Sequence, residues 1–459
     1  MPQSEWDLWA LDQRINDRGV GVDMPLAEGA VKLMAGVTVN AKARMQELTG
    51  LDNPNSQVQM KSWLKQQGYE MESLDKAHRA ELLARPHLKP VVRQVMALKA
   101  QTSNSSVKKF EMVENATCSD GRIHGLLQFY GATRTGRWAG RLLQVQNLPR
   151  NGMHQLDEAR ELVKRGDGEA LEMVWGSIPD TLKQLIRTVL VPKAGSHFAV
   201  ADFSAIEARV IAWLAGEEWT LEAFRTHGMI YEATASQMFG IPLDQIDKPT
   251  RQKGKVATLA LGYQGGTGAL IAMGALNMGL TEDELPELVT KWRKANKHIV
   301  KFWYNVEECV LKALETGRVT KLGPLKFAKR GGYLFIKLPS GRKLAYAHAR
   351  LEEGQYGPRM VYDGQGTHVA YTKLETYGGK LVENIVQATA RDLLAYAMTN
   401  LDAAGYRVVF HIHDECIVEM EDNTKKLEDL ESCMTQVPDW AEGLPLNAAG
   451  FETNYYTKG

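Results

Sequence analysis

Two aspartates, Asp202 and Asp414, each follow an apolar run that is typical of a buried strand. The runs are HFAVADFS, which ends at Ser204, and VVFHIHDE, which ends at Glu415; CIVEM then resumes an extended pattern, so we expect Asp414 in a hairpin turn. Paired carboxylates favour hard cations such as Mg²⁺, and two ions about 3.5 to 4 Å apart can stabilise the attacking and leaving oxygens of a phosphoryl transfer. Either aspartate alone is more simply explained as a turn cap.

A cationic segment, RQKGKVATLALGYQGG (251–266), lies between these aspartates in the sequence. Four-residue steps along an α-helix advance about 400°, so one helix face carries Arg251, Lys255, Leu259 and Tyr263. Two cations above one aromatic ring suit a triphosphate next to a base pair packed on Tyr263, with the cations offsetting charge on a leaving pyrophosphate. A solvated basic helix end is the alternative; two internal glycines argue a little against it, because each costs about 1 kcal/mol relative to Ala.

The whole chain has no formal charge, with 55 Lys+Arg against 55 Asp+Glu in 459 residues, and 44% of it is hydrophobic. This composition argues against a disordered, collagen-like or disulfide-stabilised protein, and mildly against a tail-driven nucleic-acid binder. The charge is nevertheless segregated. Residues 91–110 read as a basic, hydroxyl-rich helix and turn, and 131–150 hold four arginines without an acid, whereas 414–431 hold eight acids against two lysines.

The cysteines and the hydropathy pattern indicate a soluble intracellular protein. None of the four cysteines belongs to a CxxC pair, so we expect reduced thiols rather than a zinc site. No apolar stretch approaches the roughly 18 to 20 residues of a membrane span, and the N-terminus lacks the features of a signal peptide.

The elements that must position these residues are mostly helical. Two helical segments over 5–49 are broken at NDRGVGVD (16–23), where a turn is favoured, and Ser56 is the expected N-cap of the next helix. Between the two strand-end aspartates we expect 206–384 to be largely helical, apart from a β-like insert at 332–351.

Taken together, these segments resemble a known family. DFSAIEAR (202–209), R-x3-K-x7-Y (251–263) and HDE (413–415) resemble motifs A, B and C of the family A (Pol I-like) DNA polymerases, and they stand in the family's order. Further segments agree, namely TRTGR with QNLPR, YEATASQMFG, ENIVQATARD, and the thumb-like NPNSQVQMKSWL and ALKAQTS. Each motif is moderately specific, but all of them in order leave little room for chance.

The resemblance implies an α+β protein with the right-hand polymerase fold: an antiparallel palm sheet, a helical thumb and helical fingers. The implied subdomains are N-terminal palm-associated helices (1–40), the thumb (41–120), the first part of the palm with motif A at its end (121–210), the fingers with the motif B helix and a β insert (211–378), and the second part of the palm with the motif C hairpin (379–459). Because the match begins at the family's first polymerase-domain helix, we expect the polymerase domain only, without a 3′–5′ exonuclease, of the phage or prophage type.

The resemblance also implies roles for individual residues. Asp202 and Asp414 would be catalytic and would bind two Mg²⁺ ions, for which Mn²⁺ can substitute, with the Phe203 carbonyl as a further metal ligand and Glu415 in support. Lys255 would act as a general acid toward pyrophosphate. The implied dNTP-binding residues are Glu207, Arg251, Lys255, Leu259, Tyr263 and Tyr231. The implied DNA-binding residues are Arg137, Gln146, Asn147, Gln387 and His413.

Glu207 would be the steric gate that occupies the space of a ribose 2′-hydroxyl, held there by Tyr263; the alternative is an ordinary glutamate in the first turn of a helix. Three positions depart from the family pattern. Leu259 stands where Phe or Tyr is usual, Tyr231 replaces a histidine, and Gln264 replaces a glycine. The missing aromatic ring puts discrimination against 3′-deoxy sugars in question.

The implied function is a template-directed DNA polymerase that adds dNTPs to a primer 3′-hydroxyl. Its partners would be primer–template DNA and dNTPs, together with a replication helicase or primase, and we expect a monomer in the cytoplasm of a bacterial cell or a phage-infected host. Two alternatives stay open: a single-subunit RNA polymerase, against which Glu207 argues, and a catalytically inactive DNA-binding replication scaffold. The intact Asp202, Asp414 and Lys255 argue against the scaffold.

Overall fold

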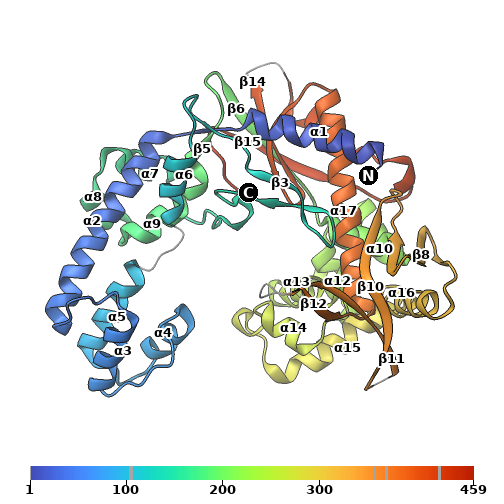
Figure 1. Ribbon diagram of the computed structural model, residues 1–459, viewed down its shortest axis with the longest axis horizontal. Coiled ribbons are helices and arrows are strands. Elements are labelled where there is room, and N and C mark those ends of the chain that lie inside the picture. The colour runs from blue at the N-terminus through green and yellow to red at the C-terminus, as the bar shows by residue number, and fades with distance from the viewer. Residues whose placement is uncertain (1, 103–106, 356, 367–370, 422–424, 459) are drawn as a thin grey trace.

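The computed structural model describes residues 2–102, 107–355, 357–366, 371–421 and 425–458. Helices and antiparallel sheets share the chain, as the α+β class requires. In Figure 1, α2 to α9 form an arm on the left, α10 to α16 and a six-stranded sheet form an arm on the right, and both join a central region at the top. In the described part of the chain no helix is both long and apolar enough to cross a membrane. Part of the basic helix and turn expected over 91–110, namely 103–106, lies outside the described residues.

The central sheet has four antiparallel strands in the order β13-β14-β6-β15. Their bounds are β6 (Ser196–Phe203), β13 (Arg407–Ile412), β14 (Glu415–Glu421) and β15 (Ala448–Thr453). The expected apolar strands and the hairpin turn at Asp414 are therefore confirmed. Most side chains of β6, β13 and β14 are buried, since α1 (Gln3–Arg18), α17 (Gly378–Ala403) and α18 (Leu427–Met434) contact the sheet or one another around it.

The left arm has a small hydrophobic core of its own. Met45, Met60, Trp63, Leu82 and Val92 form part of it, separate from the main core. Its helices include α2 (Met24–Thr49), α3 (Gln57–Gln66), α4 (Lys76–Leu83), α5 (Pro90–Thr102) and α6 (Lys108–Ala116), followed by α7 (Leu156–Arg165), α8 (Gly168–Trp175) and α9 (Ile178–Leu185).

Helix starts in this arm follow local sequence signals. The Ser56 side chain accepts a hydrogen bond from Gln59 N, so the predicted N-cap is confirmed.

The predicted break at 16–23 is also confirmed, but it is more than a turn. It contains β1 (Val20–Val22), which pairs with β2 (Arg122–Ile123) and β5 (Leu190–Val191).

Seven helices of the right arm precede its sheet in the described chain. They are α10 (Ile206–Ala215), α11 (Glu218–Thr226), α12 (Ile230–Phe239), α13 (Lys248–Leu261), α14 (Thr267–Ala272), α15 (Leu285–Ala295) and α16 (Lys297–Thr316). Gly254 explains the close packing of α12 on α13, because a Cβ there would lie 2.2 Å from the Tyr231 carbonyl oxygen. The glycine in this cationic helix therefore has a packing role that outweighs its low helix propensity.

The six-stranded sheet corrects the expectation of a helical chain with a β insert confined to 332–351. Its antiparallel order is β12-β11-β10-β9-β8-β7, and it extends from Thr320 to Glu375. The strands are β7 (Thr320–Leu322), β8 (Leu325–Arg330), β9 (Tyr333–Lys337), β10 (Lys343–Gly354), β11 (Gly357–Gln365) and β12 (Tyr371–Glu375). In β8 only LKF (325–327) alternates clearly between apolar and polar residues, which is too short a run to indicate a strand from the sequence.

Candidate active site

The two strand-end aspartates lie together where β6 ends and β14 begins, at the ends of the two inner strands of the central sheet. The β6–β14 register places Asp202 directly opposite Glu415, and Phe203 N donates a hydrogen bond of 3.0 Å to the Asp414 carbonyl oxygen. The structure thus brings Asp202, Phe203, Asp414 and Glu415 together, as the sequence predicted. Burial and the neighbouring Asp202 raise the pKa of Asp414 to about 7.

A divalent cation fits this carboxylate pair. Asp202 Oδ1 is buried and has no hydrogen-bond partner among the described residues, and an acceptor oxygen without a donor is a natural cation ligand. No cluster of three His, Cys, Asp or Glu side chains with metal-binding geometry occurs in the described chain. Oxygens of the backbone, of water or of a substrate can complete the coordination of a cation at this pair.

Lys458 is a neighbour of this site that sequence reasoning missed. Its Nζ lies 3.5 Å from Asp202 Oδ2 and 3.3 Å from Glu415 Oε2. Burial acts to lower the pKa of Lys458, but the carboxylates outweigh it and the pKa is raised. Glu415 also accepts a 2.7 Å hydrogen bond from the Tyr456 hydroxyl. The only signal in the sequence is a lysine shortly after the last strand, and no motif marks it.

Glu207 is held from two sides in the first turn of α10. The Tyr263 hydroxyl donates to Oε2 at 2.6 Å, and Arg137 Nη2 donates to Oε1 at 2.6 Å. The expected contact with Tyr263 is therefore present, whereas the contact with Arg137 was not foreseen. Burial raises the pKa of Tyr263 well above its ordinary value, so the hydroxyl keeps its proton as a donor.

The cations of α13 gather around Tyr231 at the start of α12. The guanidinium of Arg251 lies 5.4 Å and Lys255 Nζ lies 5.9 Å from the centre of the Tyr231 ring, within the range of cation–π contacts. Arg251 Nε also donates to Glu232, a partner that the sequence did not reveal. The helix ends at Leu261, so Tyr263 follows it rather than completing its last turn.

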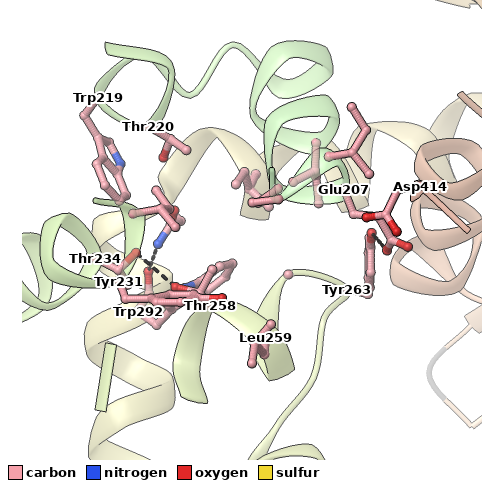
Figure 2. Close-up of a pocket in the computed structure, with 18 residues that line it drawn as sticks. Glu207, Trp219, Thr220, Tyr231, Thr234, Thr258, Leu259, Tyr263, Trp292 and Asp414 are labelled. Carbon is pink, nitrogen blue, oxygen red and sulfur yellow. Dashed lines mark hydrogen bonds between the residues drawn. The ribbon is translucent and has the colours of Figure 1, made fainter. Parts of the chain in front are cut away.

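A cavity of about 370 Å³ extends from Glu207 and Tyr263 to Tyr231. Figure 2 shows Glu207, Tyr263 and Asp414 together at one end, Leu259 toward the middle, and Tyr231 with Trp292 at the other. Leu259 is 48% exposed and offers an aliphatic surface there. The volume falls within the usual range of small-molecule sites, about 300 to 1,000 Å³.

The five residues expected to bind DNA are only partly brought together. Arg137, Gln146 and His413 line one small recess. Arg137 Nε is buried there without a partner among the described residues, so a donor remains for a ligand. Asn147 donates to Gln144 and Gln387 donates to Glu383, and neither lines that recess.

The β3–β4 hairpin lines the same recess, carries Arg137 and packs against Gln146. It consists of β3 (Leu127–Ala132) and β4 (Arg137–Gly140). Gly140 allows Gln146 to approach, because a Cβ at that position would lie 2.0 Å from Gln146 Oε1. His413 has a φ of 51°, the left-handed region that a tight hairpin turn requires. Burial, Arg137 and Lys458 lower the pKa of His413 and favour its neutral form.

Comparison with known proteins identifies close relatives. Residues 30–323 match the family model described as DNA polymerase family A. The DNA polymerase of Bacillus phage SP02 is 53% identical over 461 residues, which cover 99% of this chain and 71% of that protein. The thermostable DNA polymerase I of Thermus aquaticus is 24% identical over 72% of this chain, which spans about a third (32%) of that relative's length.

A solved structure has a similar fold. It is the POL domain of Pol1 from M. smegmatis in complex with DNA primer-template and dNTP, with a TM-score of 0.64 and 20% sequence identity. The match covers 97% of this chain and 68% of that one.

Proposed function

Because the chain belongs to DNA polymerase family A, we propose that it is a template-directed DNA polymerase that adds dNTPs to the 3′-hydroxyl of a primer. The predicted membership of this family, of the phage type, is confirmed, and so is the right-hand polymerase fold with its antiparallel sheet. The observation that carries the proposal is a cavity with Asp414 at one end and Tyr231 at the other. Asp202 lies beside Asp414, and Arg251 and Lys255 lie against the Tyr231 ring. This arrangement suits a bound dNTP whose α-phosphate lies near the aspartates.

Family A polymerases depend on metal ions, and we propose that Asp202, Asp414 and the Phe203 carbonyl hold two Mg²⁺ ions, or Mn²⁺ in their place. Such ions supply activation of the primer hydroxyl and neutralisation of the pyrophosphate charge. Glu415 does not need to bind metal in this scheme. Its buried carboxylate orients Lys458 and Tyr456 beside the aspartates.

Arg251 and Lys255 are proposed to bind the triphosphate, and both lie near the ring of Tyr231. Phosphate oxygens would compete with Glu232 for Arg251, because charge-assisted bonds to phosphate are strong and planar guanidinium groups match them. Lys255 would then deliver the proton that pyrophosphate takes as it leaves. Tyr263 and Leu259 would contact the base and the sugar of the nucleotide.

Sugar selection is assigned to Glu207. A glutamate that is fixed by both Tyr263 and Arg137 cannot easily move aside for a 2′-hydroxyl, so it would exclude rNTPs by steric contact. Arg137, Gln146, Asn147, Gln387 and His413 are proposed to contact the DNA, where minor-groove acceptors occur in every Watson–Crick pair.

The subdomain assignment follows from the same proposal. Residues 1–40 are the palm-associated helices, 41–120 the thumb, 211–378 the fingers, and 121–210 with 379–459 the palm. Primer–template DNA and dNTPs are the substrates. A helicase or primase partner and a monomeric state stay predictions, and the phage relative supports our expectation that the enzyme acts in a bacterial or phage-infected cell.

Primer extension with Mg²⁺ tests this function directly. We expect the wild-type protein to extend a primed template with dNTPs and to reject rNTPs. Substituting Glu207→Ala should raise the efficiency of rNTP incorporation about a hundredfold, since it opens the space for the 2′-hydroxyl. The efficiency of dNTP incorporation should fall by a much smaller factor. A pure preparation that adds no dNTP would refute the proposal, and unprimed synthesis from rNTPs alone would favour an RNA polymerase.

A further inference from the structure

The six-stranded sheet of the right arm has one face that the polymerase site does not use. Its other face packs on α16, with Leu325, Phe327, Leu334, Ile336 and Leu344 buried. On the outer face the strand registers align Lys321 with Lys326, Lys326 with Lys337, and Lys337 with Lys343. These four residues, the lysine row, cross four adjacent strands. At a strand spacing of about 4.8 Å the row is about 14 Å long.

The lysine row is not balanced by local acids. Residues 318–351 contain no Asp or Glu. None of the four lysines has an ion pair with another described residue. The other half of the same sheet is arranged differently. There Lys373 pairs with Glu352 at 2.8 Å and Arg359 pairs with Glu375 at 2.6 Å.

Protection of a sheet edge does not account for the row. Lysines commonly guard exposed edge strands, but β8, β9 and β10 are interior strands, so this explanation covers Lys321 alone. Like charges directly opposite one another also destabilise a sheet. A row of four therefore indicates a polyanionic ligand that neutralises them.

Two stacked aromatic rings lie beside the row on the same face. Tyr333 and Phe335 have ring centres 5.8 Å apart and an interplanar angle of 22°. Tyr333 is 41% exposed, and the residues opposite Phe335 on both sides are the small Ala328 and Ala345. Aromatic rings next to a cationic track are the combination that binds single-stranded nucleic acid, with bases on the rings and phosphates on the lysines.

The sheet is joined to the element that carries a proposed DNA-binding residue. Arg134, in the turn before Arg137 of the β3–β4 hairpin, donates a 2.9 Å hydrogen bond to the Ala345 carbonyl oxygen on β10. Its guanidinium also stacks on the rings of Tyr346 and Tyr362. Ala345 is two residues from Lys343, so a strand that leaves the proposed site has a short path to the row.

We propose that the lysine row and the Tyr333–Phe335 pair bind the unpaired 5′ overhang of the template strand. This inference rests on the proposed function, since the overhang is the single-stranded part of a primer–template substrate. The sheet face holds the overhang by contacts that are independent of base sequence: every phosphate can meet a lysine and every base has a flat surface to stack.

Binding of two primer–template duplexes tests the proposal. They share one duplex but carry a 2-nucleotide or a 20-nucleotide template overhang, and affinity is measured by fluorescence anisotropy without dNTPs over a range of salt. We expect the wild-type protein to bind the long overhang more tightly. Substituting Lys326→Glu together with Lys337→Glu should weaken that binding about tenfold and lower the salt slope by about 1.4, and it should leave the short overhang within about twofold.

The matched control is Lys329→Glu together with Lys312→Glu. Lys329 is exposed on β8 but lies opposite Leu334 and so points away from the row, and Lys312 is exposed on α16. The net charge changes equally, and binding should stay at the wild-type level. Substituting Tyr333→Ala with Phe335→Ala should weaken long-overhang binding about fivefold without changing the salt slope, whereas Tyr333→Phe should not weaken it.

Four results would overturn the proposal: equal wild-type affinity for both duplexes, an equal loss in the control variant, a preference for a 20-nucleotide displaced strand over the template overhang, or binding of an oligo-glutamate peptide that only the row variant loses. Single-nucleotide extension on the short-overhang duplex is measured in parallel. Its failure in the wild type would contradict the proposed function, whereas its retention in the row variant verifies that the variant is folded.

Discussion

The central sheet is buried on both faces over most of β6, β13 and β14, whereas the six-stranded sheet buries one face on α16 and exposes the other. Two buried acids of the central sheet have cationic partners: Glu419 pairs with Arg122 at 2.7 Å, and Glu415 contacts Lys458 as well as Tyr456. The six-stranded sheet, or outer sheet, instead carries the lysine row, which has no ion pair with another described residue. A buried charge therefore needs an opposite charge or hydrogen-bond partner within the protein. Exposed charges of one sign can lie together, because water or a bound ligand of opposite charge can neutralise them.

The largest expected effect is on the rate of primer extension, and it should differ between an aspartate of the central sheet and an aspartate of the six-stranded sheet. Substituting Asp202→Ala should lower the rate of primer extension about a thousandfold or more, because it removes a proposed metal ligand, and DNA binding should persist. Asp363→Ala is the matched control, since Asp363 on β11 pairs with Arg350 and His348. Extension rates and gel-shift affinities measure both. Equal losses in the two variants would remove the distinction between the sheets.

The next effect concerns a buried base in the central sheet. Burial, Arg391 and His413 lower the pKa of His411 to about 3. Since an unfolded histidine titrates near 6.5, the unfolded state gains a proton first as the pH falls, and stability present above that pH is lost. Because of this residue, the free energy of unfolding should fall by about 2 kcal/mol between pH 8 and pH 5.

Urea unfolding at both pH values, with His411→Gln as the comparison, measures that difference. Trp138 packs edge-on against His411 with ring centres 4.6 Å apart, and Asp12 accepts from Trp138 with a pKa raised by burial to about 6. Asp12 titrates with the opposite sign, so only the difference between wild type and variant isolates the histidine. An unchanged pH dependence in the variant would refute the assignment.

A smaller effect is expected at Lys458. Its ammonium group neutralises Asp202 and Glu415, so substituting Lys458→Ala should make the site more negative and lower the half-saturating Mg²⁺ concentration about two- to fivefold. Metal titration of extension and of Mn²⁺ binding measures this change. Lys329→Ala on the outer sheet should not alter it. A weaker metal affinity in Lys458→Ala would mean that Lys458 positions the carboxylates rather than competing with the ions.

The smallest effect tests repulsion within the lysine row. Substituting Lys337→Gln removes the like-charged neighbour of both Lys326 and Lys343 and should stabilise the protein by a few tenths of a kcal/mol. Lys373→Gln on the same sheet breaks an ion pair with Glu352 and should stabilise nothing. Thermal unfolding at low salt measures both, and destabilisation by Lys337→Gln would show that the row is not repulsive.

The same contrast explains what the sequence could predict. Strands buried on both faces appear as continuous apolar runs, so β6, β13 and the turn at Asp414 were found without the structure. Helical spacing predicted that Arg251 and Lys255 share one face of α13, and the resemblance to the family implied the contact of Tyr263 with Glu207. The outer sheet was only partly found, because lysines alternate with apolar residues in strands too short for a clear signal.

Contacts between distant segments could not be read from the sequence. Arg391 binds both carboxylate oxygens of Glu5 at 2.8 and 2.9 Å, 386 positions away, and fixes α1 against α17. Arg137 with Glu207 and Lys458 with Asp202 are further examples. Such pairs depend on the folded arrangement of elements and leave no periodic pattern in the local sequence.

Single-turnover incorporation on one primed template tests the central claim most directly. Each of the four dNTPs is offered separately, with Mg²⁺, opposite a single defined template base, and the template base is then changed. We predict that the protein adds only the complementary dNTP, and only when a primer 3′-hydroxyl is present. Absence of any incorporation, or incorporation that does not follow the template base, would contradict the assignment of this site.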